Sequence, residues 1–195
     1  MEWNLTEIAI SGAGIGGLVS ALCLKHKGID VKVFEADTEI KSLGVGINIM
    51  PHASKILIDI GLGAQLDLLG VQTRCIEYRT KFGHLIQSDP RNIEAGFEAP
   101  QYSIHRGELQ AMLATEVKKK LGKNAIEFDK SVLGFRQVGE VVTILLKDGS
   151  EVDVDLFVDA TGLHSKVRKQ MHPYEGPLCY EGTMMFRGSV ATDMI

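Results

Sequence analysis

The stretch that most constrains this chain is residues 5–35, which reads as a strand, a glycine-rich turn, a helix and a second strand. Gly12, Gly14 and Gly17 open the helix at the G-x-G-x-x-G spacing. At this spacing the first glycine permits the tight turn, the second leaves room for a pyrophosphate, and the third lets the helix pack closely. The second strand ends at Glu35, about 20 residues further on, where a carboxylate can accept hydrogen bonds from both ribose hydroxyls.

We therefore predict that this segment binds an adenine dinucleotide, and the alternative is a βαβ unit that serves packing alone. An acid rather than an arginine at position 35 argues against a 2′-phosphate in this pocket. The residues alone leave FAD and NAD as candidates.

The composition narrows the class of protein. With 195 residues, of which 45% are hydrophobic, the chain can form one sizeable core or a domain and part of another. The net charge of −4 gives no reason to expect a nucleic-acid partner, and no stretch has the length of a membrane span. Cys23, Cys75 and Cys179 are widely spaced, so we expect reduced thiols, no metal site and a cytoplasmic protein without an export leader.

Beyond residue 35 the pattern departs from the regular strand and helix alternation of a plain NAD dehydrogenase. We expect a helix from Pro51 to Gly61, a short helix to residue 69 and a strand over 102–105 before a helix that runs to residue 121. Between them, 75–79 and 84–87 predict an inserted β-hairpin, followed by a surface loop over 89–100.

The last third of the sequence predicts mostly short strands. We expect short β-segments over 125–128, 131–138, 141–146 and 151–156, which form three or four antiparallel strands, with a hairpin turn at 148–149. An apolar run over 155–162 predicts a parallel strand that returns to the main sheet, followed by a short helix over 163–171 and a further strand over 180–188. Arg106 stands at the start of the long helix, where it either pairs with Glu108 or faces a phosphate or a flavin edge.

Four ordered motifs then carry a family resemblance: the βαβ signature, 44–47 with Pro51, the segment 105–109, and the segment 158–168. The chain resembles the N-terminal half of the FAD-dependent aromatic-ring monooxygenases of the salicylate and 6-hydroxynicotinate hydroxylase type. The family usually has Asp where this chain has Thr161, which puts NAD(P)H handling in question more than FAD binding. The family's third motif, Gly-Asp-Ala, does not occur in these 195 residues.

The resemblance implies an α/β fold: a Rossmann-like FAD-binding domain with a parallel sheet, antiparallel β-insertions and the start of a substrate domain. It implies an FAD-binding domain over residues 1–175, interrupted by the hairpin insertion at about 71–104, and the first strand of a substrate domain over 176–195. The implied cofactor-binding residues are Gly12, Ala13, Gly14, Gly17, Glu35, Ala36, Gly46, Ile47, Arg106, Val132, Thr161 and Gly162.

The implied activity is hydroxylation of a small aromatic substrate with FAD, NAD(P)H and O₂. Some relatives carry a histidine base at the position of Asn48, whose amide cannot take up a proton near neutral pH, and His52 is the nearest substitute. The catalytic residues are therefore unknown at this stage. The competing hypothesis is a non-catalytic dinucleotide-binding module that acts through partner contacts, and an exposed apolar edge could also produce a homodimer.

Overall fold

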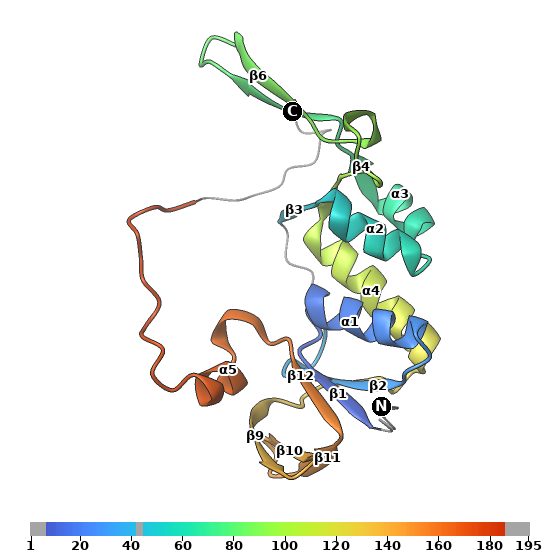
Figure 1. The fold of residues 1–195 in the computed structure, drawn as a ribbon, viewed down its shortest axis with the longest axis vertical. Helices are drawn as coiled ribbons and strands as arrows, with labels where there is room; N and C mark the ends of the chain where they lie inside the picture. Colours follow the sequence, from blue (N-terminus) through green and yellow to red (C-terminus); the bar gives the residue numbers. More distant parts are fainter. Residues whose placement is uncertain (1–6, 42–44, 186–195) are drawn as a thin grey trace. The chain divides into compact units, whose positions relative to one another are not determined.

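The computed structural model describes residues 7–41 and 45–185, which fall into two compact units (Figure 1). Among the described residues, unit 1 comprises 7–41 and 110–185, and unit 2 comprises 45–109. The boundary falls inside one helix, α4 (Arg106–Leu121). Gly44 of the motif at 44–47 and residues 186–188 of the last expected strand lie outside the described residues.

Unit 1 is built on a four-stranded parallel sheet with the strand order β12-β1-β2-β8. The strands are β1 (Ile8–Ser11), β2 (Val31–Phe34), β8 (Ile126–Glu127) and β12 (Leu156–Asp159). The helix α1 (Ile15–His26) joins β1 to β2 and buries Leu18, Ala21 and Leu22. The predicted βαβ unit and the returning parallel strand are both confirmed.

A second, antiparallel sheet covers part of the parallel sheet. It has the order β11-β10-β9 and consists of β9 (Val132–Val138), β10 (Val141–Leu146) and β11 (Glu151–Val154). Ala9 and Phe34 of the parallel sheet share one buried cluster with residues of these strands and with Val167 of α5 (Lys166–Met171). Since β1 is buried along its whole length, its continuous apolar run is explained by packing on both faces.

Three or four antiparallel strands were expected over residues 125–156, and the structure has three of them, β9, β10 and β11. The first expected segment, 125–128, contains β8, which pairs in parallel with β2 because the preceding helix α4 supplies the crossover that a parallel neighbour needs. One strand prediction in unit 1 is wrong. Residues 180–185 form no strand in the described part of the chain. The apolar pattern there lacks a neighbouring strand to pair with among the described residues, and a lone strand leaves its backbone groups unsatisfied. The helix expected over 163–171 is a 3₁₀ turn, η2 (Gly162–His164), followed by α5.

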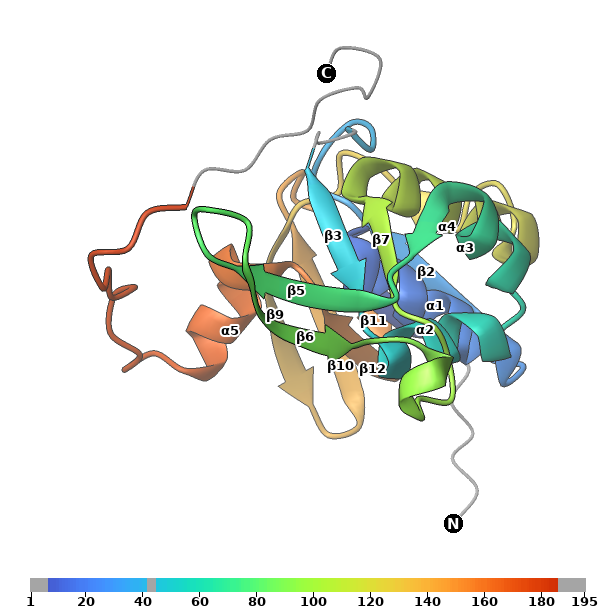
Figure 2. The ribbon, with the colours of Figure 1, turned by 90° about the horizontal axis from the view of Figure 1, so that it is seen from above.

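Unit 2 contains two small sheets and two short helices. The antiparallel sheet β3-β7-β4 consists of β3 (Gly46–Ile49), β7 (Tyr102–His105) and β4 (Gly70–Gln72), and Figure 2 shows β3 and β7 side by side. The helices are α2 (Pro51–Asp59), with the proline in its first turn as predicted, and α3 (Gly63–Leu69).

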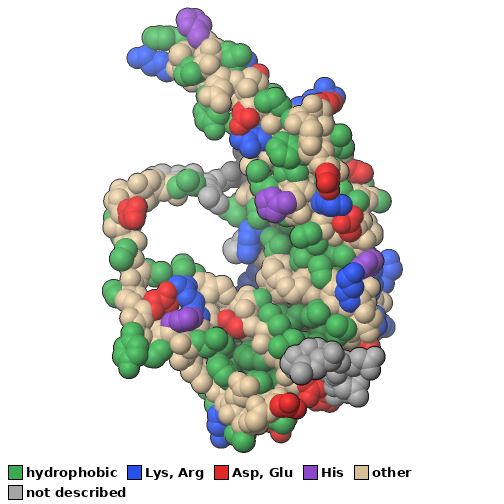
Figure 3. Space-filling model, viewed as in Figure 1, with side chains coloured by type: hydrophobic (Ala, Val, Ile, Leu, Met, Phe, Trp, Pro, Cys, Tyr) green, Lys and Arg blue, Asp and Glu red, His purple; other side chains and the backbone are tan. Residues whose placement is uncertain are grey.

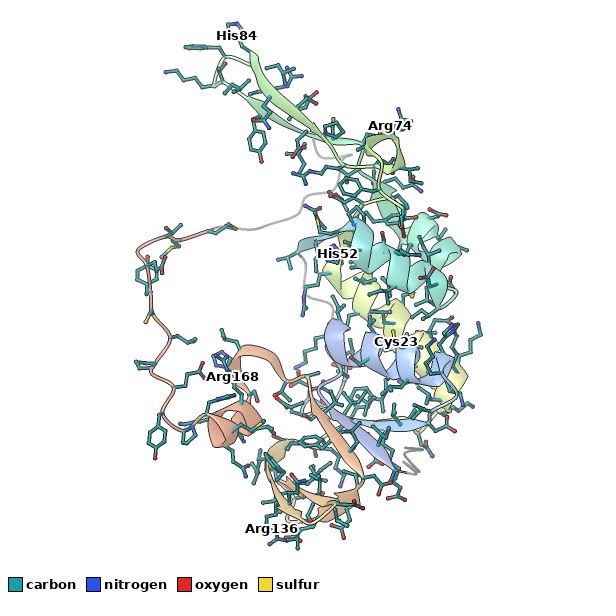
Figure 4. All side chains as sticks on the ribbon, in the orientation of Figure 1. Cys23, His52, Arg74, His84, Arg136 and Arg168 are labelled. Atoms are coloured by element: carbon teal, nitrogen blue, oxygen red, sulfur yellow. The ribbon has the colours of Figure 1, made fainter. Side chains whose placement is uncertain are left out.

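The inserted hairpin of unit 2 is confirmed as β5 (Cys75–Arg79) and β6 (Leu85–Pro90). A 3₁₀ turn, η1 (Ile93–Ala95), interrupts the loop that follows it. Hydrophobic side chains remain exposed along the hairpin (Figure 3), among them Phe82 and Ile86. Figure 4 shows His84 at its tip. The hairpin therefore contributes little to the core of unit 2.

A buried tyrosine braces unit 2. Tyr102 of β7 is 2% exposed, and its hydroxyl donates a hydrogen bond of 2.6 Å to Oδ1 of Asp67 in α3. The amide of Gln72 donates to the same oxygen at 2.9 Å. Burial, and secondarily the bond to Asp67, raise the pKa of Tyr102 to about 12. The bond from Tyr102 lowers the pKa of the Asp67 carboxyl. The pair thus ties α3 to the sheet.

Candidate functional site

The glycine-rich turn begins where β1 ends. Gly12 has φ +95°, a left-handed conformation that favours glycine, and its N–H donates to the carbonyl of Phe34 at 2.7 Å. A Cβ at this position would lie 2.7 Å from the carbonyl oxygen of Ala160. The glycine is therefore needed both for the turn itself and for the close approach of a second turn.

Gly14 leaves open space at the start of α1. It is the N-cap of the helix, no side chain caps the helix there, and a Cβ at Gly14 would have no neighbour within 4 Å. The backbone N–H groups of a first helical turn lack intrahelical partners and carry the positive end of the helix dipole. An uncapped N-terminus behind a glycine with free space in front of it fits a phosphate group.

Gly17 has a different role from the one expected. A Cβ at Gly17 would lie 1.9 Å from the carbonyl oxygen of Gly12, and 3.4 Å from Cβ of Ala160. The glycine therefore lets the helix close over its own turn, more than over the sheet. Gly17 is a requirement of the fold, whereas the space at Gly14 is not filled by the protein.

Glu35 follows β2 and is fixed by two backbone donors. Its Oε2 accepts a hydrogen bond of 2.6 Å from the N–H of Ala13, and its Oε1 accepts one of 3.0 Å from the N–H of Asp37. A carboxylate has about four lone-pair sites, so both oxygens keep capacity for hydroxyl donors. The carboxylate is thus held beside the turn in a form that can accept from a ribose, while Ala36 next to it is exposed.

The turn has a support that the sequence did not reveal. The carbonyl of Ala13 accepts a hydrogen bond of 2.8 Å from the side-chain amide of Gln110 in α4. Both backbone polar groups of Ala13 are therefore engaged within the protein, and its side chain is fully buried. Ala13 braces the turn. No local pattern distinguishes Gln110 from other polar residues of its helix.

The second turn follows β12 and includes Thr161 and Gly162. Thr161 is exposed and donates its hydroxyl to Oδ1 of Asp159 at 2.8 Å, and Gly162 has φ +78°. Val132, also expected at the cofactor, is 8% exposed and belongs to the buried cluster of unit 1. If Val132 contacts a ligand, the contact would therefore be made by its main-chain atoms.

A hollow of about 730 Å³ lies beside these turns in unit 1, and its lining includes Gly16, Gly162 and Arg168. Figure 4 shows Arg168 on α5. This volume is in the range of small-molecule sites. Another hollow, of about 540 Å³, lies at the amino ends of β1 and β2 and is lined by Glu7 and Asp30 among others. The first hollow runs along β12 and reaches Gly16 and Gly162, but neither hollow is lined by Gly14 or Glu35. Open α/β sheets bind ligands at the carboxyl ends of their strands, so we place the candidate site at the Gly12–Gly14 turn and Glu35.

Unit 2 brings together the remaining predicted residues. Gly46 pairs with His105 across β3 and β7, and the N–H of Arg106 donates to the carbonyl of Val45 at 2.9 Å. Arg106 thus lies next to the Gly46-Ile47 segment. The structure describes both Arg106 and Glu108, and they form no ion pair. The interpretation that Arg106 pairs with Glu108 is therefore not supported.

The sheet of unit 2 also fixes Asn48. Its Oδ1 accepts a hydrogen bond of 2.8 Å from the hydroxyl of Ser103, which is itself 2.8 Å from the hydroxyl of Thr73. The amide nitrogen of Asn48 is directed away from this bond and stays a donor only. His52 is exposed on α2 (Figure 4), and none of the described residues forms a hydrogen bond or an ion pair with it. Nothing in its surroundings marks it as a base.

The fold and the site together define a dinucleotide-binding domain of the Rossmann type: a parallel sheet, an uncapped helix after a G-x-G-x-x-G turn, and a fixed acid after the second strand. The chain belongs to the FAD binding domain family, whose profile matches residues 5–186. The dinucleotide of this fingerprint is therefore FAD rather than NAD.

Similar proteins of known activity are hydroxylases and monooxygenases. The chain is 38% identical to phenazine 1,6-dicarboxylic acid hydroxylase PhzS of Lysobacter antibioticus, over 96% of this chain and 48% of that enzyme. It is 32% identical to 3-amino-4-hydroxybenzoate 2-monooxygenase of Streptomyces cremeus, over 97% of this chain and 47% of that enzyme. The chain spans about half the length of the curated relatives it matches.

The solved structures agree with this placement. The structure of Klebsiella pneumoniae HpxO complexed with FAD and uric acid matches with a TM-score of 0.72 and 31% identity, over 85% of this chain and 41% of that one. Among the described residues, no helix has the length and apolar character that crossing a membrane requires. The family resemblance and the fold class expected from the sequence are both confirmed, whereas the predicted domain boundaries stay predictions.

Proposed function

We propose that this chain is the FAD-holding part of a flavoprotein monooxygenase that hydroxylates a small aromatic substrate with NAD(P)H and O₂. The observation that carries the proposal is the pairing of free space at Gly14 with the carboxylate of Glu35, which is fixed beside the same turn. Membership of the FAD binding domain family identifies the ligand. The activities of the relatives support the reaction class.

Residues of different chemistry would bind different parts of the cofactor. The N-terminal turn of α1, behind Gly14, would hold the pyrophosphate, and Glu35 would accept from the ribose hydroxyls. Thr161 and Gly162 form a second turn that can approach the cofactor with its backbone. Arg106, with Gly46 and Ile47 beside it, would contact the flavin part or a phosphate oxygen. These residue roles are proposals.

When it is bound, FAD supplies the redox chemistry that passes electrons from NAD(P)H to O₂. The residues of this chain contribute binding and orientation. The two carboxylate oxygens of Glu35 are held beside the turn, where they can accept hydrogen bonds. The positive end of the α1 dipole offsets the negative charge of the phosphates. Asn48 can donate a hydrogen bond to a polar substituent of an aromatic ring but cannot remove a proton from it.

The test is a titration of the purified 195-residue chain with FAD, followed by flavin absorbance and fluorescence, with NAD as the competing ligand. We expect one FAD per chain and no displacement by NAD, because the family ligand is FAD. NADH oxidation with a panel of aromatic acids then tests the reaction class. A folded chain that binds NAD and not FAD would overturn the proposal. If Gly14→Val bound FAD with wild-type affinity, the glycine-rich turn would not be part of the FAD site.

We further propose a cytoplasmic location and reduced thiols, supported by the three cysteines, all of which are free. Thiol titration of the unfolded protein under non-reducing conditions should give three equivalents. A homodimer also stays a proposal, supported by the exposed apolar side chains of the β5–β6 hairpin, and light scattering at several concentrations measures it. A monomer at all concentrations contradicts the dimer without affecting FAD binding.

A further inference from the structure

The carboxylate of Asp159 in unit 1 accepts hydrogen bonds from three hydroxyl groups that belong to separate segments. Oδ1 of Asp159 accepts from Ser11 at 2.6 Å and from Thr161 at 2.8 Å, and Oδ2 accepts from Ser165 at 2.5 Å. A carboxylate only accepts, so all three hydroxyls must donate to it, which fixes their orientation. Hydrogen bonds to a charged acceptor are stronger than neutral ones.

The three hydroxyls come from the parts that build the dinucleotide site. Ser11 is 1% exposed and immediately precedes Gly12, and Thr161 lies in the second turn. Ser165 is 7% exposed and caps α5 by accepting from the N–H of Arg168 at 2.7 Å. A single side chain therefore joins the end of β1, the second turn and the start of α5.

The two turns are also in close backbone contact. The N–H of Ala160 donates to the carbonyl of Ser11 at 2.8 Å, and Gly12 approaches Ala160 so closely that no Cβ would fit between them. Any shift of the second turn is therefore transmitted to the first. The resemblance to the hydroxylases places an aspartate at position 161; in this chain Thr161 stands there and donates to a carboxylate two residues earlier.

We propose that Asp159 is a positioning residue of the dinucleotide site: by accepting from Ser11, Thr161 and Ser165 it holds the Gly12-to-Gly14 turn and the second turn together in the arrangement that receives the pyrophosphate. Asp159 acts through these hydroxyls. The inference rests on the proposed function for its ligand, while the ordering of the turn is a property of the unliganded chain.

The first experiment measures amide hydrogen exchange in the unliganded chain for Asp159→Asn and for a control, Asp153→Asn. Asp153 lies on β11 and accepts a 2.6 Å bond from the hydroxyl of Thr143, so the control removes the same kind of bond in the same unit, away from the turns. We expect Asp159→Asn to raise exchange about tenfold at Gly12 and Ala13, the hydrogen-bonded amides of the segment 12–17, and to leave residues 141–146 unchanged.

The control should leave residues 12–17 as they are in the wild type. Equal increases in both segments of Asp159→Asn would show general destabilisation and overturn a positioning role, and so would unchanged exchange over 12–17. If Asp159→Asn does not fold, the exposed Thr161→Val variant replaces it. We expect an increase of about threefold at Gly12 and Ala13 from Thr161→Val, since one of three bonds is lost. No increase from Thr161→Val overturns the proposal.

The second experiment measures the FAD dissociation constant of the same variants. We expect the FAD dissociation constant to rise about tenfold in Asp159→Asn and to stay unchanged in Asp153→Asn. The double variant Ser11→Ala with Asp159→Asn should bind FAD no more weakly than Asp159→Asn alone. Additive losses would show that Ser11 and Asp159 act independently. If the wild type binds no FAD, the proposed function fails, while the exchange experiment still decides whether Asp159 orders the turn.

Discussion

Gly14 and Gly17 belong to the same motif, yet the structure predicts opposite consequences for their substitution. An added Cβ at Gly17 would lie 1.9 Å from the carbonyl oxygen of Gly12. Ordinary contact begins near 3.4 Å, so the helix and the turn would have to separate by about 1.5 Å. Both atoms are held by backbone, and no flexible side chain can yield. We expect Gly17→Ala to lower the free energy of unfolding by about 3 kcal/mol.

Gly14 has φ −68° and ψ 173°, which any residue adopts, and its Cβ would meet open space. Gly14→Val should therefore change the free energy of unfolding by less than about 1 kcal/mol. Its methyl groups would nevertheless occupy the space in front of the helix N-terminus. We expect the FAD dissociation constant to rise at least about 100-fold, which corresponds to about 2.7 kcal/mol.

Urea unfolding of the unliganded variants, followed by circular dichroism, separates the two effects from each other. With a typical slope near 2 kcal/mol/M, Gly17→Ala should lower the urea midpoint by about 1.5 M, whereas Gly14→Val should stay close to the wild type. FAD titration then completes the comparison. Equal midpoints for the two variants, or wild-type FAD affinity in Gly14→Val, would refute the division of roles.

Three further substitutions test single contacts. Glu35→Gln should raise the FAD dissociation constant about tenfold in a fluorescence titration, because the charge that accepts from the ribose is lost; an unchanged constant would exclude Glu35 from the site. Arg106→Ala should also weaken FAD binding in that titration, whereas the exposed Arg74→Ala should not, and equal effects would point to charge alone. Tyr102→Phe should cost about 1–2 kcal/mol of unfolding free energy in urea at neutral pH, because Asp67 loses a donor. Since the pKa of Tyr102 rises from its ordinary 10.0 to about 12 on folding, its contribution is complete below pH 10 and is lost as pH rises toward 12, a loss that the phenylalanine variant should not show.

The parts of the fold that the sequence predicted well are those whose signal is local. The turn, helix and acid of the βαβ unit lie within one stretch, and each has a residue type that the geometry demands, such as Gly12 with φ +95°. Strand pairing is different. Residues 125–128 have the pattern of a strand whether their neighbour is parallel or antiparallel, and only the position of α4 before them decides for β2.

The supporting contacts of the site could not be predicted for a related reason. Ser11 and Asp159 are separated by 148 positions, and Ala13 and Gln110 by 97. Neither Asp159 nor Gln110 stands out from its surroundings by periodicity or spacing, because a hydrogen-bonding partner so distant leaves no local pattern. In the segment 180–185 the opposite happened: a strand was expected from the local sequence, but no strand pairs with the segment among the described residues.

The strand order locates the site independently of the glycine motif. The chain passes from β1 to β2 on one side, and it later returns to place β12 on the other side of β1. In open parallel sheets such a reversal leaves a crevice at the carboxyl ends of the two strands, where ligands bind. Gly12 follows β1 and Ala160 follows β12, so the two turns meet at this reversal. The fold therefore provides the place for a dinucleotide, and side chains such as Glu35 and Asp159 determine how firmly the turns are held in position to bind it.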